Sequence, residues 1–286
     1  MLRILLVLVV AGLVIFFLWR RFGLRTVGNR GEGVPALPSP GSDLPLVIER
    51  EVRLWSHLPE VLKETLVPRV REFLECIPFE GAHDFQVTDD MRIAIAVQAC
   101  IVTLGHADYP FDDLHGITLH PDEFVVEESE EDEETGVVTE GYRAISGQSQ
   151  GSDRIVLSWR DVVDAQTRED GYNVVIHEVT HFLEHSHPGG DRAARAALEA
   201  AYESLCDAVD RGEDTLLDPY GAEDLTEFFA VSAEFFFERP VDLRERHPTL
   251  YVLLRDSFRL DPATWHARDS QAETRRTSKD PWPSRP

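Results

Sequence analysis

The hydrophobic residues at the start of the chain form one uninterrupted run. Residues 4–19 read ILLVLVVAGLVIFFLW, and with the first two residues they are about as long as a helix that crosses a bilayer. A cleaved signal peptide would need a cleavage site with small residues, whereas here FFLW leads directly into Arg20 and Arg21. The pattern therefore predicts a transmembrane helix over residues 2–19.

The segment after this run is expected to be a flexible linker over residues 20–45, because residues 28–45 are rich in Gly, Pro and Ser. Basic residues flank the hydrophobic run unequally: Arg3 precedes it, and four arginines follow it, namely Arg20, Arg21, Arg25 and Arg30. By the positive-inside rule, this asymmetry predicts a single-pass membrane protein whose larger part faces the cytoplasm.

Beyond residue 45 the hydrophobic positions change from helical to strand spacing and back again. Helical spacing predicts helices over residues 51–76 and 89–104, and Thr88 or Asp89 can cap the second. The expected strands are 117–126, which Pro121 interrupts, 142–146 and 154–159, with a polar connection at 147–153. The later expected helices are 172–185, 192–210 and 224–238. Strands followed by helices indicate an α+β domain over residues 46–262, with a small mixed sheet and a helical half. The polar residues 263–286 are expected to form a loosely ordered tail.

Composition and charge narrow the range of functions. The chain has 286 residues, 43% of them hydrophobic, so it can bury a sizeable core. Its formal net charge of -24 argues against nucleic acid as a partner, because a phosphate backbone would be repelled. Cys76, Cys100 and Cys206 make no disulfide framework, which fits reduced thiols in a reducing compartment. The acidic run EESEEDEE, residues 127–134, is expected to be a solvated loop.

One short motif carries recognisable chemistry: His177, Glu178 and His181 form H-E-x-x-H within GYNVVIHEVTHFLEH. Residues four apart lie on one face of a helix, so the two imidazoles can hold one zinc ion. Glu178 can then take a proton from a zinc-bound water and act as a general base. Val174 and Val175 indicate that this helix is buried, where polar side chains are costly unless something binds them.

A catalytic zinc ion usually has a third protein ligand, and the sequence offers three candidates. His185 lies about 12 Å from the first histidine along the same helix, too far for both to share one ion comfortably. His187 fits the metzincin spacing, except that Glu184 replaces the glycine at which the chain turns and no methionine follows the motif. Glu227 shares a helix face with Glu234 among several phenylalanines, where a carboxylate needs a cation as its partner.

Five longer blocks resemble the Mlc titration factor A family of zinc-dependent peptidases, whose catalytic core is similar to that of anthrax lethal factor. The blocks occur in the order of that family and cover most of the chain after the linker, at residues 110–126, 146–159, 171–184, 220–240 and 247–262. The resemblance implies a zincin-like domain of the gluzincin type, which hydrolyses peptide bonds by zinc-activated water.

The resemblance also implies roles for individual residues. The zinc ligands would be His177, His181 and Glu227, and Glu178 would be the general base. Tyr220 matches a tyrosine that can donate a hydrogen bond to the oxyanion.

Three further features follow from the same resemblance. His115 aligns with a histidine that the family associates with the metal, as an additional ligand. Glu234 would hold a ligating imidazole from behind. The strand 154–159 would be the sheet edge along which an extended peptide lies.

Two functions remain open. The first is a zinc peptidase at the cytoplasmic face of the membrane, acting on a peptide or protein substrate. The second is a membrane-tethered module that sequesters a regulatory protein, because the resembled family takes its name from sequestering a transcriptional repressor. The complete motif favours the enzyme, since protein binding alone does not require Glu178.

Overall fold

The computed structural model describes the part of the chain after the expected anchor, with short gaps. The described residues are 44–108, 110–122, 124–131, 138–145, 147–150, 153–168, 170–186 and 192–265. The transmembrane helix predicted over residues 2–19 lies outside them, as does almost all of the linker predicted over residues 20–45. Among the described residues, no helix combines the length and the hydrophobicity that a bilayer crossing requires.

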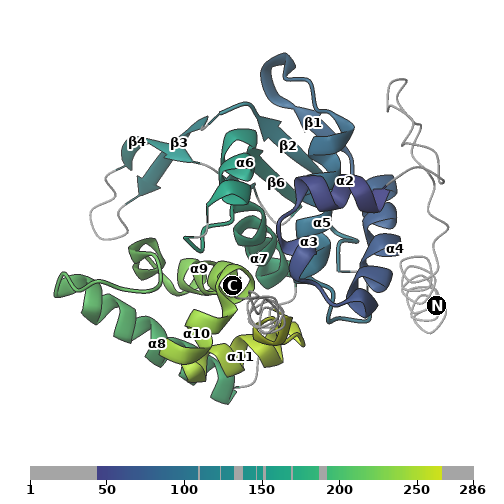
Figure 1. Cartoon of the computed structure of the whole chain (residues 1–286). Coiled ribbons are helices and arrows are strands. Elements are labelled where there is room, and N and C mark those ends of the chain that lie inside the picture. The colour runs from purple at the N-terminus through teal and green to yellow at the C-terminus, as the bar shows by residue number, and fades with distance from the viewer. Residues whose placement is uncertain are drawn as a thin grey trace, which may run out of the picture. The chain divides into compact units, whose positions relative to one another are not determined.

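The central sheet of the described residues has four strands in the order β1-β2-β6-β5. Figure 1 labels three of them, β1, β2 and β6. Strands β1 (Phe79–Gly81), β2 (Gly116–His120) and β6 (Arg154–Ser158) pair in parallel, and β5 (Gly147–Gln150) pairs antiparallel with β6. This small mixed sheet, together with the helices that follow it, confirms an α+β domain.

Strand β5 corrects two predictions. Residues 147–153 were expected to be a polar connection, but Gly147–Gln150 forms the edge strand of the sheet. The strand 154–159 was expected at the edge, whereas β6 lies between β2 and β5. The sequence GQSQ has no hydrophobic alternation, so the pattern that reveals a half-buried strand is missing from it.

A separate two-stranded antiparallel sheet consists of β3 (Phe124–Glu131) and β4 (Val138–Ile145). The strand predicted over residues 117–126 with an interruption at Pro121 is confirmed, because β2 ends before this proline and β3 begins after it. The solvated loop predicted over residues 127–134 was wrong for its first five residues, which belong to β3. Backbone pairing with β4 stabilises this segment despite its acidic side chains, a tertiary effect that charge patterning does not reveal.

The first helices are α2 (Leu44–Glu51), α3 (Leu54–His57), α4 (Glu60–Cys76) and α5 (Asp89–Val102). The single helix predicted over residues 51–76 is broken before α4. Leu58 adopts an extended conformation, as expected for a residue that precedes a proline, and Pro59 then becomes the N-cap of α4. The predicted capping of α5 is confirmed, because the hydroxyl of Thr88 accepts a hydrogen bond from the backbone N of Met91 at 3.4 Å.

The second group of helices comprises α6 (Trp159–Thr167), α7 (Val174–Ser186), α8 (Arg192–Asp210), α9 (Leu225–Glu238), α10 (Pro240–Arg246) and α11 (Pro248–Phe258). Helices α7, α8 and α9 confirm the predictions closely, whereas α6 was not predicted. Two short 3-10 helices, η1 (Ala82–Asp84) and η2 (Pro219–Ala222), complete the described elements. Helix α7 packs against β5, β6, α5 and α9, and so lies between the sheet and the later helices (Figure 1).

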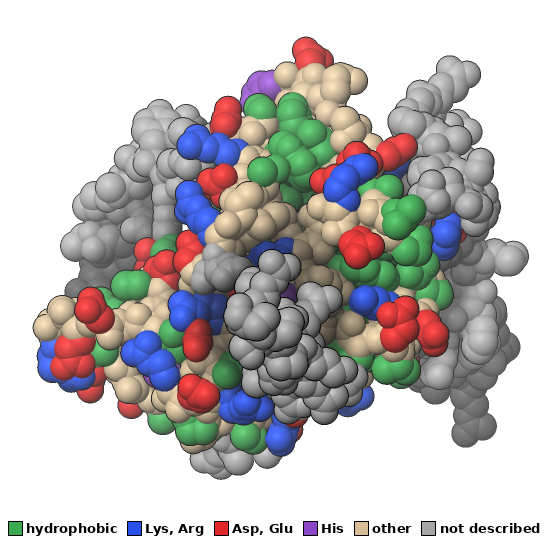
Figure 2. Space-filling model, in the orientation of Figure 1, with side chains coloured by type: hydrophobic (Ala, Val, Ile, Leu, Met, Phe, Trp, Pro, Cys, Tyr) green, Lys and Arg blue, Asp and Glu red, His purple; other side chains and the backbone are tan. Residues whose placement is uncertain are grey.

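The core and the surface have different patterns of side chains. Phenylalanines of α9 fill the core of the helical half, where the ring of Phe236 contacts Tyr251 and Phe258. Trp265 is buried, so packing includes the first residues of the tail predicted over residues 263–286. Residues 266–286 of that prediction lie outside the described residues. Acidic and basic side chains are interspersed on the face shown in Figure 2.

Candidate metal centre

The entry into α7 is fixed by two residues. Gly171 has φ +102, and a Cβ atom at this position would lie 2.5 Å from Cζ of Phe235, so only glycine fits. The side-chain oxygen of Asn173 accepts hydrogen bonds from the backbone N of Val175 at 3.1 Å and of Ile176 at 3.2 Å, which caps the helix. The first turn of α7 is therefore anchored immediately before the H-E-x-x-H motif.

The structure brings His177, His181 and Glu227 together from α7 and α9, with one ligand atom of each within 4.8 Å of the others. The Nε2 atoms of the two histidines are 3.0 Å apart, and Oε2 of Glu227 lies 3.0 Å from Nε2 of His177 and 3.3 Å from Nε2 of His181. Zinc bonds of about 2.0–2.2 Å in tetrahedral geometry place ligand atoms at similar mutual distances. The donor set of two imidazoles and one carboxylate therefore fits a divalent ion such as zinc.

Glu227 owes its position to the start of α9. The carboxylate of Asp224 accepts hydrogen bonds from the backbone N of Thr226 at 2.7 Å and of Glu227 at 2.9 Å. This cap begins the helix so that Glu227 lies in its first turn, facing α7. The side chain of Glu227 is 20% exposed, so the centre is accessible from outside.

Glu234 lies on the same face of α9 as Glu227 and contacts the other ring nitrogen of His177. Its Oε1 is 2.8 Å from Nδ1 of His177, and its Oε2 accepts a hydrogen bond from the backbone N of Asn173. A carboxylate at Nδ1 fixes the ring orientation and leaves Nε2 directed at the centre. The geometry that the resemblance implied for Glu234 is therefore present.

The electrostatics of the centre favour a cation. Burial would lower the pKa of His177, but hydrogen bonds to Glu227 and Glu234 outweigh it and raise this pKa to about 10. Burial would raise the pKa of Glu227, but hydrogen bonds to both imidazoles hold it well below its usual range. Two carboxylates thus stabilise positive charge at one buried point, which a divalent ion also supplies.

Glu178 is buried beside this centre, and its Oε2 has no hydrogen-bond partner among the described residues. Burial raises the pKa of Glu178 to about 7, although the neighbouring His177 and His181 act in the opposite direction. A carboxyl group with a pKa near neutrality can both accept and return a proton.

The other predicted site residues differ in position. The ring of Tyr220 in η2 lies 6.0 Å from the ring of His177, centroid to centroid, so it is beside the centre. The side chain of His115 is 68% exposed, and its Nδ1 lies 2.9 Å from Oδ2 of Asp153. Neither His115 nor His185 belongs to the group of converging ligand atoms found among the described residues, and His187 lies outside those residues.

Residues that complete the surroundings of the centre were not predicted. Asn173, Gln98 and Glu238 form a buried polar network around the start of α7. The sequence did contain one indication of the role of Asn173, because an asparagine just before a hydrophobic helical run is a typical N-cap. Its contacts with α5 and α9 span 75 and 65 residues of sequence, which no local pattern reveals.

Comparisons with known proteins extend over most of the described chain. Residues 38–259 match the model of the family described as glucose-regulated metallo-peptidase M90. Mlc titration factor A of Serratia proteamaculans is 33% identical over 227 residues, which cover 74% of this chain and 85% of that protein. The corresponding protein of Pectobacterium atrosepticum is 31% identical over 224 residues, covering 74% of this chain and 84% of its own. An uncharacterized protein of Synechocystis is 30% identical over 226 residues, covering 73% of this chain and 80% of its own. The family model matches most of the chain, and the matched region includes His177, His181 and Glu227. This chain therefore belongs to the glucose-regulated metallo-peptidase M90 family.

Proposed function

We propose that this protein is a zinc-dependent peptidase of the zincin-like, gluzincin type. The observation that carries the proposal is the convergence of His177, His181 and Glu227 beside the buried carboxylate of Glu178. The three ligands would hold zinc, which when bound acidifies a water molecule and polarises the carbonyl of the scissile peptide bond.

Each remaining residue of the centre has a chemical role in this proposal. Glu178 would take the proton from the attacking water and return it to the leaving amine, which its raised pKa suits. The ring of Tyr220 lies 6.0 Å from that of His177, centroid to centroid, and its hydroxyl would donate a hydrogen bond to the oxyanion. Glu234 would keep the ring of His177 in the ligating orientation.

The substrate would be an extended peptide or protein segment. Strand β5 is the edge strand that packs against α7, whereas β1 forms the opposite edge, so a peptide paired with β5 would run past the centre. This role replaces the one expected for residues 154–159, because β6 is covered by β5 on that side.

A second function is favoured by the names of the relatives. Two of them are called Mlc titration factor A, which points to binding of a regulatory protein named Mlc. We infer that a regulatory protein is a candidate partner of this chain, either as a substrate or as a sequestered ligand.

The location is also a proposal. The transmembrane helix predicted over residues 2–19, followed by four arginines, would anchor the domain at the cytoplasmic face of the membrane.

Hydrolysis of a peptide panel tests the choice between enzyme and binding module. The protein is expected to cleave at least one member, to lose activity with a zinc chelator, and to recover it when zinc is restored. Absence of cleavage by the zinc-loaded protein, together with tight binding of a regulatory protein, would instead support the binding module.

A further inference from the structure

A closed ring of polar groups lies at the N-terminal end of α7. The side-chain amide of Asn173 donates to Oε1 of Glu238 at 2.7 Å and to Oε1 of Gln98 at 2.8 Å. The amide of Gln166 also donates to Gln98, at 3.0 Å, and the backbone N of Arg53 donates to Oε1 of Gln166 at 3.0 Å. The guanidinium of Arg53 closes the ring by pairing with Oε2 of Glu238. The ring connects α7 with α5, α6, α9 and the segment that begins α3.

Asn173 is the member of this ring that belongs to the start of α7, and it is fully buried. Its side-chain amide joins the ring, while its side-chain oxygen caps α7 and its backbone carbonyl accepts from the backbone N of His177 at 3.0 Å. Its backbone N donates to Glu234. One residue therefore holds both the start of the metal helix and the carboxylate that orients His177.

An unbroken chain of contacts consequently leads from Arg53 to the metal centre. Arg53 pairs with Glu238, Glu238 accepts from Asn173, Asn173 donates to Glu234, and Glu234 lies 2.8 Å from Nδ1 of His177. A shift of Glu238 would be passed to Asn173, and through it to the two groups that set the position of the imidazole.

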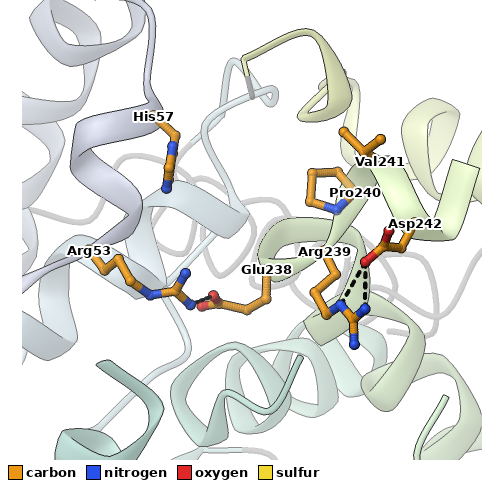
Figure 3. Close-up of a pocket in the computed structure, with 7 residues that line it drawn as sticks. All are labelled: Arg53, His57, Glu238, Arg239, Pro240, Val241 and Asp242. Carbon is orange, nitrogen blue, oxygen red and sulfur yellow. Dashed lines mark hydrogen bonds and ion pairs between the residues drawn. The ribbon is translucent and has the colours of Figure 1, made fainter. Parts of the chain in front are cut away.

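Arg53 and Glu238 also line a cavity of about 330 Å³. Figure 3 shows their charged groups directed toward each other, while Arg239 pairs with Asp242 on another part of the wall. Within the part of the chain that the structure describes, a hydrogen bond joins only the first of these two ion pairs to Asn173. The second pair provides a matched comparison within the same cavity.

The burial of Glu238 suggests a role other than stability. Its side chain is 1% exposed, and placing a carboxylate out of contact with water has a cost that an ion pair often fails to recover. Such a group can instead specify one arrangement of the elements around it. We propose that Glu238, held by Arg53, is a positioning residue for the metal ligand His177, acting through Asn173 and Glu234. This inference rests on the proposed function, because it assumes that His177 binds zinc.

The test compares zinc affinity and cobalt spectra in purified protein at pH 8. Glu238→Gln removes the charge that Arg53 holds, and it is expected to weaken zinc binding by about fivefold, somewhat less than the tenfold or more typical of groups in direct contact with a ligand. The visible absorption bands of bound Co²⁺ are expected to shift, because they report the arrangement of its ligands. Two control variants are expected to stay within about twofold of wild type with unchanged cobalt bands. They are Arg239→Met, on the same cavity wall, and Arg92→Met, which removes a buried arginine elsewhere.

A double-mutant cycle separates positioning from general loss of packing. Asn173→Ser keeps a helix-capping oxygen but removes the amide that reaches Glu238. If the two residues act through one route, the variant with both changes is expected to bind zinc about as weakly as the weaker-binding single variant. If Glu238→Gln fails to fold, the zinc affinity and cobalt spectrum of Asn173→Ser alone test the same connection.

Two results would overturn the inference. One is a zinc affinity and cobalt spectrum in Glu238→Gln or Asn173→Ser that match the wild type. The other is an equal change in the two arginine controls, or fully additive effects in the cycle. Failure of the proposed function gives a different result, namely a wild type that binds no zinc, or one whose zinc affinity is unchanged by His177→Ala.

Discussion

At the scale of single residues, three glutamates surround His177 and differ in their environments. Glu227 is half-buried and lies against both imidazoles, whereas Glu234 is enclosed and contacts Nδ1 of His177. Glu178 is buried and has one oxygen without a partner among the described residues. Burial and hydrogen bonding set the proton affinity of a carboxylate, so one residue type can serve as ligand, positioning group and base.

The third metal ligand can be identified by substitution. Glu227→Gln is expected to weaken zinc binding by about tenfold or more, because it removes the charge that faces both imidazoles. His115→Ala is expected to leave zinc affinity unchanged, since the side chain of His115 is directed to Asp153. Measurement by competition with a chromophoric chelator checks both. Zinc loss in His115→Ala, with none in Glu227→Gln, would contradict this choice of ligand.

Glu184 predicts a pH dependence of stability. Burial raises its pKa from an ordinary value of 4.5 to about 7, partly opposed by His181. Because the folded protein binds this proton more tightly than the unfolded chain, the stabilisation is complete below pH 4.5 and is lost as the pH rises through 7.

The measurement compares the free energy of unfolding of wild type and Glu184→Gln at pH 5 and pH 8, without metal. The wild type is expected to lose more stability over this interval than the variant, which cannot titrate at this position. Equal losses in both proteins would contradict the assignment.

The residues with chemistry were predictable where their spacing is local. His177, Glu178 and His181 were identified from one helical turn, because helix geometry alone places the two histidines together. The phenylalanine-rich helix offered Glu227 and Glu234 together, and the family resemblance implied Glu227 as the ligand. Its position opposite α7 depends on contacts between residues 50 apart in the sequence. No local sequence pattern identified Glu238 as part of the site, because its partners Asn173 and Arg53 lie far away in the sequence.

At the scale of elements, strong periodicity and capping residues made α7, α8 and α9 predictable almost to the residue. Strand β5 and helix α6 were missed for different reasons. The polar sequence of β5 has no strand pattern and is stabilised by pairing with β6. Helix α6 begins at Trp159, the last residue of a predicted strand, where Ser158 ends β6 and caps the helix by accepting from the backbone N of Asp161 at 3.3 Å.

The turn before α7 provides a test of how tightly this element is placed. Gly171→Ala is expected to destabilise the protein by about 2–4 kcal/mol, because it adds a clash with the ring of Phe235 to the strain of positive φ. Gly212→Ala is the matched control, since its φ is +65 and an added Cβ would have no atom within 4 Å. Its expected cost is only about 1 kcal/mol.

Urea denaturation of both glycine variants gives the comparison. A similar loss of stability in the two proteins would show that the contact between Gly171 and Phe235 of α9 accommodates a methyl group, contrary to this packing.

At the scale of the whole molecule, charge and hydrophobicity are unevenly distributed along the sequence. The hydrophobic run and its arginines lie at the start of the chain. Residues 1–30 contain five of the 28 basic residues and none of the 52 acidic residues, so the rest of the chain carries 52 acidic against 23 basic side chains. The acidic part should be repelled by an anionic leaflet, so attachment would depend on the hydrophobic run.

A reporter that is active only outside the cytoplasm tests the proposed topology. Fused after Pro286, it is expected to be silent, because the basic residues after the hydrophobic run keep the larger part of the chain inside. Activity from this fusion would contradict the orientation. In the control, serines replace the four arginines, and some reporter activity is expected; the replaced residues are Arg20, Arg21, Arg25 and Arg30.

The most direct test of the central claim measures zinc content and peptide hydrolysis together in wild type and Glu178→Gln. This change keeps the shape of the side chain and removes the base, while the convergent ligands remain in place. The variant is expected to retain about one zinc ion per chain and to lose hydrolysis by about two orders of magnitude or more. A Glu178→Gln protein that holds zinc and cleaves peptides at nearly the wild-type rate would contradict the mechanism.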